Sequence, residues 1–205
     1  MKIIVFGATG GVGKRVVEQA VENGFEVTAF VRTPSKLEIS HENLSVVKGD
    51  AFNPAEVAAA IAGHDAVVSS LGSSQGMKKS TELQEMVKNI VAGMQEHGVE
   101  RIVYTASAGI YGELPGVSGK LMMGVLKNAL KDHRAAVDSI EAHGLAYTIV
   151  RPMGLMNAPF SGKYREAAEG VPEKSKSISR ADVAHFILKA LNDKKYENTS
   201  IGIAT

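Results

Sequence analysis

Three glycines stand three residues apart near the start of the chain, in the segment GATGGVG. Gly7, Gly10 and Gly13 follow an apolar run of β-type residues and precede an amphipathic stretch. In that context the first glycine permits a tight turn, the second lets the backbone approach a pyrophosphate, and the third lets helix and strand pack closely. The following helix directs its free N–H groups at the phosphates. The segment therefore predicts a dinucleotide site, with an ordinary glycine-rich βα turn as the alternative.

The same segment does not satisfy the phosphate-binding pattern of nucleoside triphosphatases. That pattern requires a glycine at position 8 and a hydroxyl residue directly after Lys14. The chain has Ala8 and Arg15 at these two places. We therefore reject a triphosphate site.

A basic residue follows the second apolar run, where proteins selective for NAD usually carry Asp or Glu to bind the ribose 2′-hydroxyl. That residue is Arg32. A guanidinium attracts a 2′-phosphate, whereas a carboxylate repels it, and Ser35 and Lys36 offer further donors. The pattern favours NADPH over NADH, with a solvated loop arginine as the alternative.

Further candidates follow the later apolar runs. Asp50 can accept a hydrogen bond from an adenine amino group or cap a turn, and Gly72 permits close approach of a ribose or forms a plain turn. Ser107 can bond a nicotinamide carboxamide or a substrate carbonyl, or cap its own turn. Pro152 and Gly154 fix a loop that can lie against the nicotinamide ring.

The elements that must position these residues alternate between β-type runs and helical patterns. This alternation is typical of a doubly wound parallel sheet with helices on both faces, in which ligands bind beyond the carboxyl ends of the strands. Ser179 with Asp182 three residues later predicts the start of the last helix. The expected strands are Lys2–Phe6, Glu26–Val31, Ser45–Val47, Ala66–Leu71, Arg101–Thr105, Leu145–Val150 and Ser200–Ala204, the last at the sheet edge, and the main helices are Val12–Asn23, Pro54–Ala62 and Thr81–His97.

Composition narrows the class of protein. The 205 residues, 44% of them hydrophobic, predict one globular domain, residues 1–205. A formal net charge of +1 without a basic cluster argues against nucleic acid, so a small molecule is the expected partner. The absence of cysteine excludes thiolate catalysis, and the histidines lack metal-ligand spacing, so no metal is expected. Without a long apolar run, we expect a cytoplasmic protein and no membrane partner.

Together these motifs resemble atypical short-chain dehydrogenase/reductases of the NAD(P)H-binding, NmrA-like kind, and within them the flavin reductase/biliverdin-IXβ reductase family. The likeness runs from GATGGVG through LGS, TASA and RPMG to ISRADVAHFILKAL, nearly the whole chain. It implies a monomeric Rossmann fold that binds NADPH and passes hydride to a flavin or linear tetrapyrrole. By position it assigns Gly7, Thr9, Gly10, Val12 and Gly13 to the pyrophosphate, Arg32 to the 2′-phosphate, Asp50 and Ala51 to the adenine, and Leu71, Gly72, Ser107 and Pro152 to the ribose and nicotinamide.

Two departures from known patterns bear on the chemistry. Met153, which we assign with Pro152 to the cofactor site, stands where mammalian flavin reductases have a histidine. This departure leaves cofactor binding intact and argues against a tetrapyrrole substrate. No tyrosine is followed four residues later by lysine, so the Tyr-x-x-x-Lys acid of alcohol and ketone reductases is missing. Hydride transfer to a flavin or quinone needs less help, because the acceptor ring delocalises the charge. We expect an NADPH-dependent reductase of a conjugated acceptor, with a non-catalytic NADP(H) sensor as the alternative.

Two residue types near the substrate side allow more than one interpretation. We interpret His133 as a surface histidine of a helix, with a substrate-facing position as the alternative. The methionines are interpreted as core filler, although a flexible thioether also suits flat, variable ligands. They are Met122, Met123, Met153 and Met156.

Replacing Arg32 by alanine tests the predicted cofactor preference. Loss of a charge-assisted contact of about 1.5–3 kcal/mol should weaken NADPH binding by roughly ten- to a hundredfold. NADH lacks the 2′-phosphate and should bind with unchanged affinity. Calorimetric titration of both cofactors measures the effect. Equal affinities of the unmodified protein for NADPH and NADH would contradict the assignment.

Overall fold

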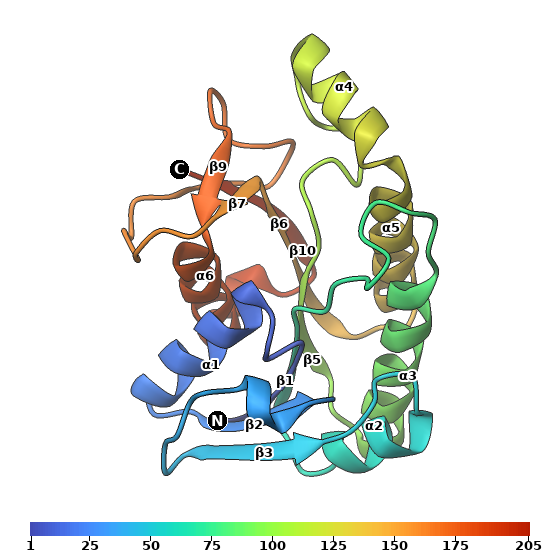
Figure 1. Cartoon of the computed structure of the whole chain (residues 1–205), viewed down its shortest axis with the longest axis vertical. Coiled ribbons are helices and arrows are strands. Elements are labelled where there is room, and N and C mark those ends of the chain that lie inside the picture. Colours follow the sequence, from blue (N-terminus) through green and yellow to red (C-terminus); the bar gives the residue numbers. More distant parts are fainter.

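Eight strands form the central sheet of the computed structural model, which describes residues 1–205 (Figure 1). The strand order is β3-β2-β1-β4-β5-β6-β10-β8. The first six strands have the Rossmann order, with its switch point between β1 and β4. The predicted doubly wound α/β fold is therefore confirmed. The strands are β1 Lys2–Phe6, β2 Glu26–Val31, β3 Leu44–Lys48, β4 Ala66–Ser69, β5 Arg101–Thr105, β6 Ala146–Pro152, β8 Arg165–Ala167 and β10 Thr199–Ala204.

The C-terminal region departs from the expected sheet. β10 pairs in parallel with β6, but it does not form the edge, because β8 pairs with it from outside in the antiparallel direction. A separate parallel pair is formed by β7 (Gly154–Met156) and β9 (Ser177–Ser179). Three-residue strands show too little alternation to be recognised in a sequence. The predicted last strand is therefore confirmed as β10, but its expected position at the sheet edge was wrong.

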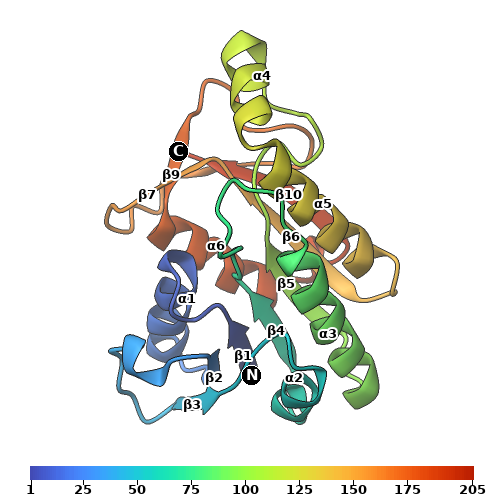
Figure 2. The same ribbon diagram turned by 45° about the vertical axis from the view of Figure 1, so that its right-hand side comes forward.

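Helices cover both faces of the sheet, as Figures 1 and 2 show from two sides. α1 (Gly11–Glu22) and α6 (Arg180–Asn192) pack together on one face, over a core that includes Val16 and Phe186. The other face carries α2 (Pro54–Ile61), α3 (Glu82–His97) and α5 (Lys127–Glu141). Short 3-10 helices occur at Pro34–Lys36 and Lys194–Tyr196.

One helix stands away from this body at the top of Figure 1. α4 (Gly116–Val125) has no buried residue, and Val117 and Leu121 are strongly exposed. It is separate from α5, so two helices lie between β5 and β6. No helix in the structure combines the length and the apolar character needed to cross a bilayer.

The start of α6 fixes the segment that precedes it. Ser179 accepts a hydrogen bond from the N–H of Asp182 at 2.9 Å, so the predicted N-cap is confirmed. The buried Asp182 carboxylate also accepts from the N–H groups of Ser161 and Gly162. Burial by itself raises the pKa of Asp182, but the hydrogen bonds from Ser179, Ser161 and Gly162 outweigh it and hold the pKa below its ordinary value.

The N-terminus of α3 is capped from another helix. Asp132 on α5 is 1% exposed and accepts hydrogen bonds from the N–H groups of Leu83 and Gln84, both at 3.2 Å. These donors have no partner inside α3 because they belong to its first turn. The carboxylate therefore joins the two helices that flank the open end of the sheet.

Replacing Asp132 by alanine should destabilise the protein by about 2–3 kcal/mol, because two buried N–H groups lose a charged acceptor. Asp138→Ala on the same helix is the control, because that carboxylate is exposed and pairs only with Arg134. Urea denaturation of the three proteins gives the free energies of unfolding. Equal losses in the two variants would contradict this role of Asp132.

Candidate functional site

A cavity of about 320 Å³ lies at the carboxyl ends of β1 to β4, at the switch point of the sheet. We call it the glycine-loop cavity. Eight of the sequence-predicted site residues line it. They are Gly7, Thr9, Gly10, Arg32, Asp50, Ala51, Leu71 and Gly72.

The glycines of this cavity serve different purposes. Gly7 has φ +80°, and a Cβ there would lie 2.5 Å from the carbonyl oxygen of Ser70. A Cβ on Gly13 would lie 2.2 Å from the carbonyl oxygen of Gly7. The fold therefore requires these two glycines. At Gly10 the nearest atom would be 3.1 Å away, and at Gly72 nothing lies within 4 Å. The contact at Gly10 is tight but less severe than those at Gly7 and Gly13, and packing does not require a glycine at position 72. Close approach of a ligand to these two residues stays a prediction.

The first turn of α1 fits an anionic ligand. The helix has no side-chain cap and no acidic residue in its first turn. α2 and α6, by contrast, are capped by Asn53 and Ser179. Uncapped N–H groups at a positive helix end are the donors that pyrophosphates use. Val12 and Gly13 lie buried within this turn and do not line the cavity, so their assignment to the pyrophosphate stays a prediction.

The structure separates the residues predicted for the adenosine end. Arg32 is exposed at the rim of the glycine-loop cavity and has no carboxylate in ion-pair range. Ser35 and Lys36 are exposed in the 3-10 helix and are not part of the cavity lining. Asp50 accepts a hydrogen bond from the N–H of Phe52 at 3.1 Å, so its turn-capping interpretation is confirmed. A contact with adenine stays a prediction.

A residue that the sequence analysis did not select also lines this cavity. Glu82 at the start of α3 accepts hydrogen bonds from the N–H and the hydroxyl of Ser74, at 2.6 and 2.7 Å. These bonds lower the pKa of Glu82 to about 2. The carboxylate holds the loop after β4 against the helix. An acid in the first helical turn was the available signal, but only the fold brings it to Ser74.

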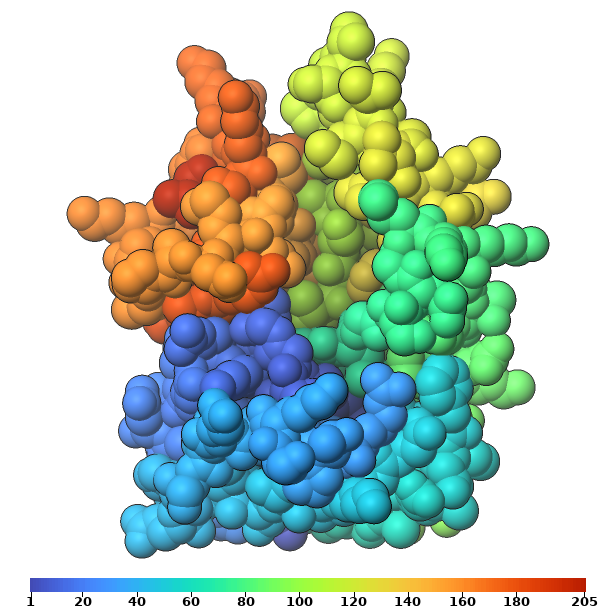
Figure 3. Space-filling view, in the orientation of Figure 1, coloured from blue at the N-terminus to red at the C-terminus, as the bar shows by residue number.

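A larger cavity of about 780 Å³ lies beyond the carboxyl ends of β5 and β6. We call it the open cavity. The space-filling view shows a hollow here, between the orange C-terminal segments and the green and yellow ones (Figure 3). Ser107 lines it, and its hydroxyl donates to the carbonyl of Ala108 at 3.1 Å, as the turn interpretation expected. Pro152, Met153 and Met122 also line it.

The other two methionines of that group have different positions. Met123 packs against the core, and Met156 is 45% exposed outside the cavity lining. The core interpretation therefore holds for Met123 alone. Lys176 adds a basic side chain to the lining of the open cavity.

His133 is not the surface histidine that we expected. It lines the open cavity, and its Nδ1 lies 2.9 Å from the hydroxyl of the buried Tyr104. Burial lowers the pKa of His133 to about 4, and burial raises the pKa of Tyr104. At neutral pH the pair is uncharged. Tyr104 is fully buried and does not line the cavity, so His133 is the member of the pair that supplies an uncharged polar group to the wall.

A buried ion pair supports the floor of the open cavity. Arg151 on β6 contacts Glu113 at 2.6 Å, with side-chain exposures of 2% and 10%. The guanidinium also donates to the carbonyl of Gly170 and to the hydroxyl of Ser200. Glu113 belongs to the loop after β5 that carries Ser107. The pair therefore fixes this loop against β6 and β10.

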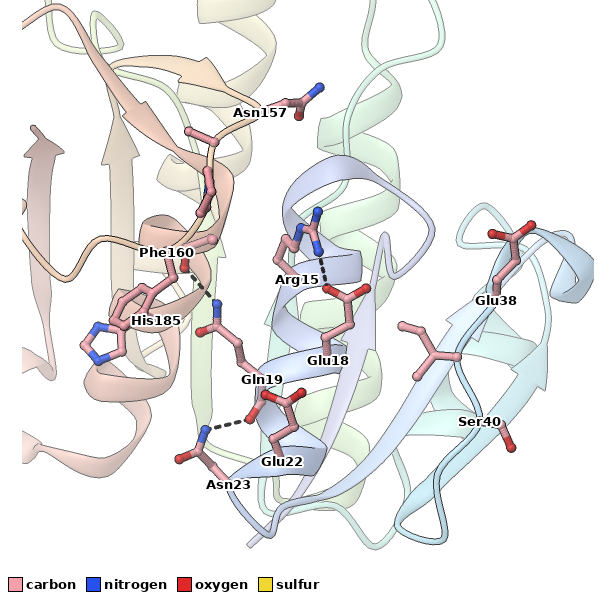
Figure 4. Close-up of a pocket in the computed structure, with 14 residues that line it drawn as sticks. Arg15, Glu18, Gln19, Glu22, Asn23, Glu38, Ser40, Asn157, Phe160 and His185 are labelled. Carbon is pink, nitrogen blue, oxygen red and sulfur yellow. Dashed lines mark hydrogen bonds and ion pairs between the residues drawn. The ribbon is translucent and has the colours of Figure 1, made fainter.

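A third hollow, of about 1150 Å³, lies elsewhere on the surface. It follows the outer side of α1, between that helix and the segment containing Asn157 and Phe160 (Figure 4). Arg15 and Glu18 pair across one turn of the helix at 2.7 Å. The hollow is remote from the strand ends, and it contains none of the predicted site residues. No three His, Asp or Glu side chains in the structure are grouped to hold a metal.

The glycine-loop cavity and the open cavity follow one another along the carboxyl edge of the sheet, as a dinucleotide site requires. A family model described as NAD(P)H-binding matches residues 7–194. The chain belongs to this family. Membership in the NAD(P)H-binding family supports the predicted atypical short-chain dehydrogenase/reductase group.

Known proteins agree with this assignment. This NAD(P)H-binding chain is 30% identical over 211 residues to an uncharacterized sugar epimerase of Bacillus subtilis, covering 99% of this chain and 94% of that protein. A short-chain dehydrogenase/reductase of Veillonella parvula in complex with NADP superposes with a TM-score of 0.85 at 23% identity, covering 100% and 94% of the two chains. ChuY, an anaerobilin reductase of Escherichia coli, superposes with a TM-score of 0.79 at 23% identity, covering 98% of this chain and 97% of that chain. At these identities the two structures support the fold alone.

Two glycine substitutions separate packing from ligand approach. Gly10→Ala should lower the melting temperature less than Gly13→Ala does, because its Cβ would stand 3.1 Å from the carbonyl oxygen of Gly7. It should weaken NADPH binding by about a hundredfold, because the predicted pyrophosphate position requires close approach to this turn. Gly13→Ala should lower the melting temperature itself, because its Cβ would meet backbone 2.2 Å away. Thermal melting and cofactor titration on the same samples measure both effects. Normal NADPH binding by a folded Gly10→Ala protein would show that the phosphates bind elsewhere.

Proposed function

We propose that the protein is an NADPH-dependent reductase that transfers hydride to a flat conjugated acceptor such as a flavin or a quinone. The observation that carries this proposal is the open cavity beside the glycine-loop cavity. Its lining is mostly small and apolar, and Ser107 and Pro152 bring it to the strand ends where a nicotinamide would lie. A volume of about 780 Å³ is within the range of cavities that hold ligands of this size.

The preference for NADPH over NADH is supported by the unpaired guanidinium of Arg32 at the rim of the glycine-loop cavity. An arginine without a carboxylate partner is free to make two parallel hydrogen bonds with a phosphate. No acidic side chain follows β2 to take the ribose 2′-hydroxyl. Both features suit a 2′-phosphate.

The chain's own residues act mainly by holding the two reactants together. Bound NADPH supplies the hydride. Ser107 orients the nicotinamide or the acceptor through its hydroxyl, and the apolar side chains Met122 and Met153 exclude water from the acceptor face. Positioning of this kind contributes several kcal/mol of barrier lowering. His133, oriented by its contact with the buried Tyr104, supplies an uncharged hydrogen-bonding partner to the acceptor, and solvent supplies the proton.

This chemistry favours a conjugated acceptor over an alcohol, a ketone or a sugar. Reactions of alcohols, ketones and sugars need an acid at the reacting oxygen, and the Tyr-x-x-x-Lys pair that supplies it is absent. ChuY, described as an anaerobilin reductase, has the same fold, and linear tetrapyrroles belong among the acceptors to be tested.

A second function is favoured by one further observation, the exposed apolar residues of α4. Val117, Leu121 and Val125 are 85%, 71% and 54% exposed and recur at helical spacing beside the open cavity. A non-catalytic NADP(H) sensor would use such a surface to contact a protein according to cofactor state. The two functions can be distinguished because a reductase turns over an acceptor, whereas a sensor binds NADP(H) without turnover.

A screen of acceptors and one serine variant test the proposed reductase activity. NADPH oxidation should be stimulated by FMN, riboflavin, a quinone or biliverdin, and Ser107→Ala should reduce turnover about tenfold, the effect of one lost hydrogen bond of roughly 1.4 kcal/mol. Tyr111→Phe is the control, because its ring lies outside both cavities beside Arg134 and Arg151. Steady-state rates give the comparison.

Two results would change the interpretation. A loss of three or more orders of magnitude in Ser107→Ala would identify the hydroxyl as an essential proton donor. Tight NADPH binding without turnover of any acceptor would contradict the reductase proposal and favour the sensor proposal.

A further inference from the structure

The side chain of Arg180 lies against the first turn of α1. Arg180 is the first residue of α6, and a Cβ placed on Gly11 would stand 2.5 Å from its Nε and 2.7 Å from its Cδ. Its Nη1 donates to the side-chain oxygen of Asn157 at 2.9 Å. The arginine can occupy this position only because residue 11 has no side chain. This accounts for a glycine that the three-residue spacing of the loop does not demand.

The charges around Arg180 are not balanced. No carboxylate lies within ion-pair range of its guanidinium. The nearest structure is the N-terminus of α1, which carries a partial positive charge, no side-chain cap and no acidic residue in its first turn. A cation beside a positive helix end is unfavourable, and an anion between them removes the repulsion.

The two helices hold this arrangement in place. Gln19 on α1 donates to the carbonyl of Ala181 on α6 at 2.9 Å, one residue beyond Arg180. Ser179 caps α6 immediately before it. The backbone positions of Gly11 and Arg180 are therefore fixed relative to each other, and only the arginine side chain is free to adjust to a ligand.

We propose that Arg180 binds the pyrophosphate of the dinucleotide from the side opposite the glycine turn, and that Gly11 is glycine in order to admit this side chain. The proposal rests on the proposed function and extends it to a residue about 170 positions from the glycine loop. Arg32 recognises the 2′-phosphate, which only NADPH carries. Arg180 recognises the pyrophosphate, which NADPH and NADH share.

Replacing the two arginines should therefore change cofactor binding in different ways. Arg180→Ala should weaken the binding of NADPH and of NADH equally, about tenfold, whereas Arg32→Ala should weaken the binding of NADPH alone. Arg180→Lys should recover part of the affinity, because it keeps the charge and loses the planar fork. Arg15→Ala is the control on α1, because that arginine is 54% exposed and pairs with Glu18 on the outer side of the helix.

A double-mutant cycle tests the role of Gly11. Gly11→Ala should displace the guanidinium of Arg180 and weaken the binding of both cofactors by about as much as Arg180→Ala does. The double variant should lose no more than either single variant, because both changes remove the same contact. Thermal melting without cofactor separates binding from folding, and Arg180→Met gives a second variant that keeps the aliphatic stem.

The outcomes separate this proposal from the reductase. If the unmodified protein binds both cofactors and Arg180→Ala binds them equally well, Arg180 is not a pyrophosphate ligand. If Arg180→Ala and Arg180→Met lower only the melting temperature, the arginine acts through Asn157 as a structural bridge and the proposal is overturned. If the unmodified protein binds neither cofactor, both proposals fail. An equal loss for both cofactors with an unchanged melting temperature supports the proposal.

Discussion

Backbone contact at Gly7 is the constraint on which the nucleotide half of the structure depends. The carbonyl of Ser70 after β4 lies where a side chain at Gly7 would have to be, and the carbonyl of Gly7 lies where a side chain at Gly13 in α1 would have to be. β1, β4 and α1 therefore meet at one point without intervening side chains. This contact sets the switch point of the sheet and opens the uncapped end of α1 toward the cavity beside it. The same atoms that close the core thus create the predicted phosphate position.

The other half of the site depends on a buried charge. Arg151 is almost fully enclosed, and it is tolerated there because Glu113, Ser200 and Gly170 satisfy its guanidinium. Through Glu113 it holds the loop that brings Ser107 to the open cavity, and through Ser200 it connects β6 to β10. One half of the site is therefore organised by the absence of side chains and the other by a charged side chain with several partners.

The helices α1 and α6 connect these two halves on one face of the sheet. Their contact places Arg180 over the glycine turn, while Asp182 of the same helix ties down the segment at Ser161 and Gly162. α6 therefore supports both the proposed cofactor position and the C-terminal segments beside the open cavity. On the opposite face, Asp132 caps α3, and its neighbour His133 reaches the open cavity. On α5 and on α6, a residue that supports the structure therefore lies beside a candidate functional residue.

The sequence by itself determined the doubly wound fold, the strand ends after which the site residues occur, and the N-cap at Ser179. These features depend on local patterns of two to four residues and on the rule that parallel strands end at the same edge. Only the tertiary structure decided which polar residues share a cavity. Glu82 and His133 reach the two cavities through packing between distant segments, and Arg180 reaches Gly11 in the same way. Ser35 and Lys36 do not line either cavity, although Arg32 is close in sequence. Spacing along a chain fixes neighbours within one element, whereas the direction of a side chain across elements depends on how the helices pack.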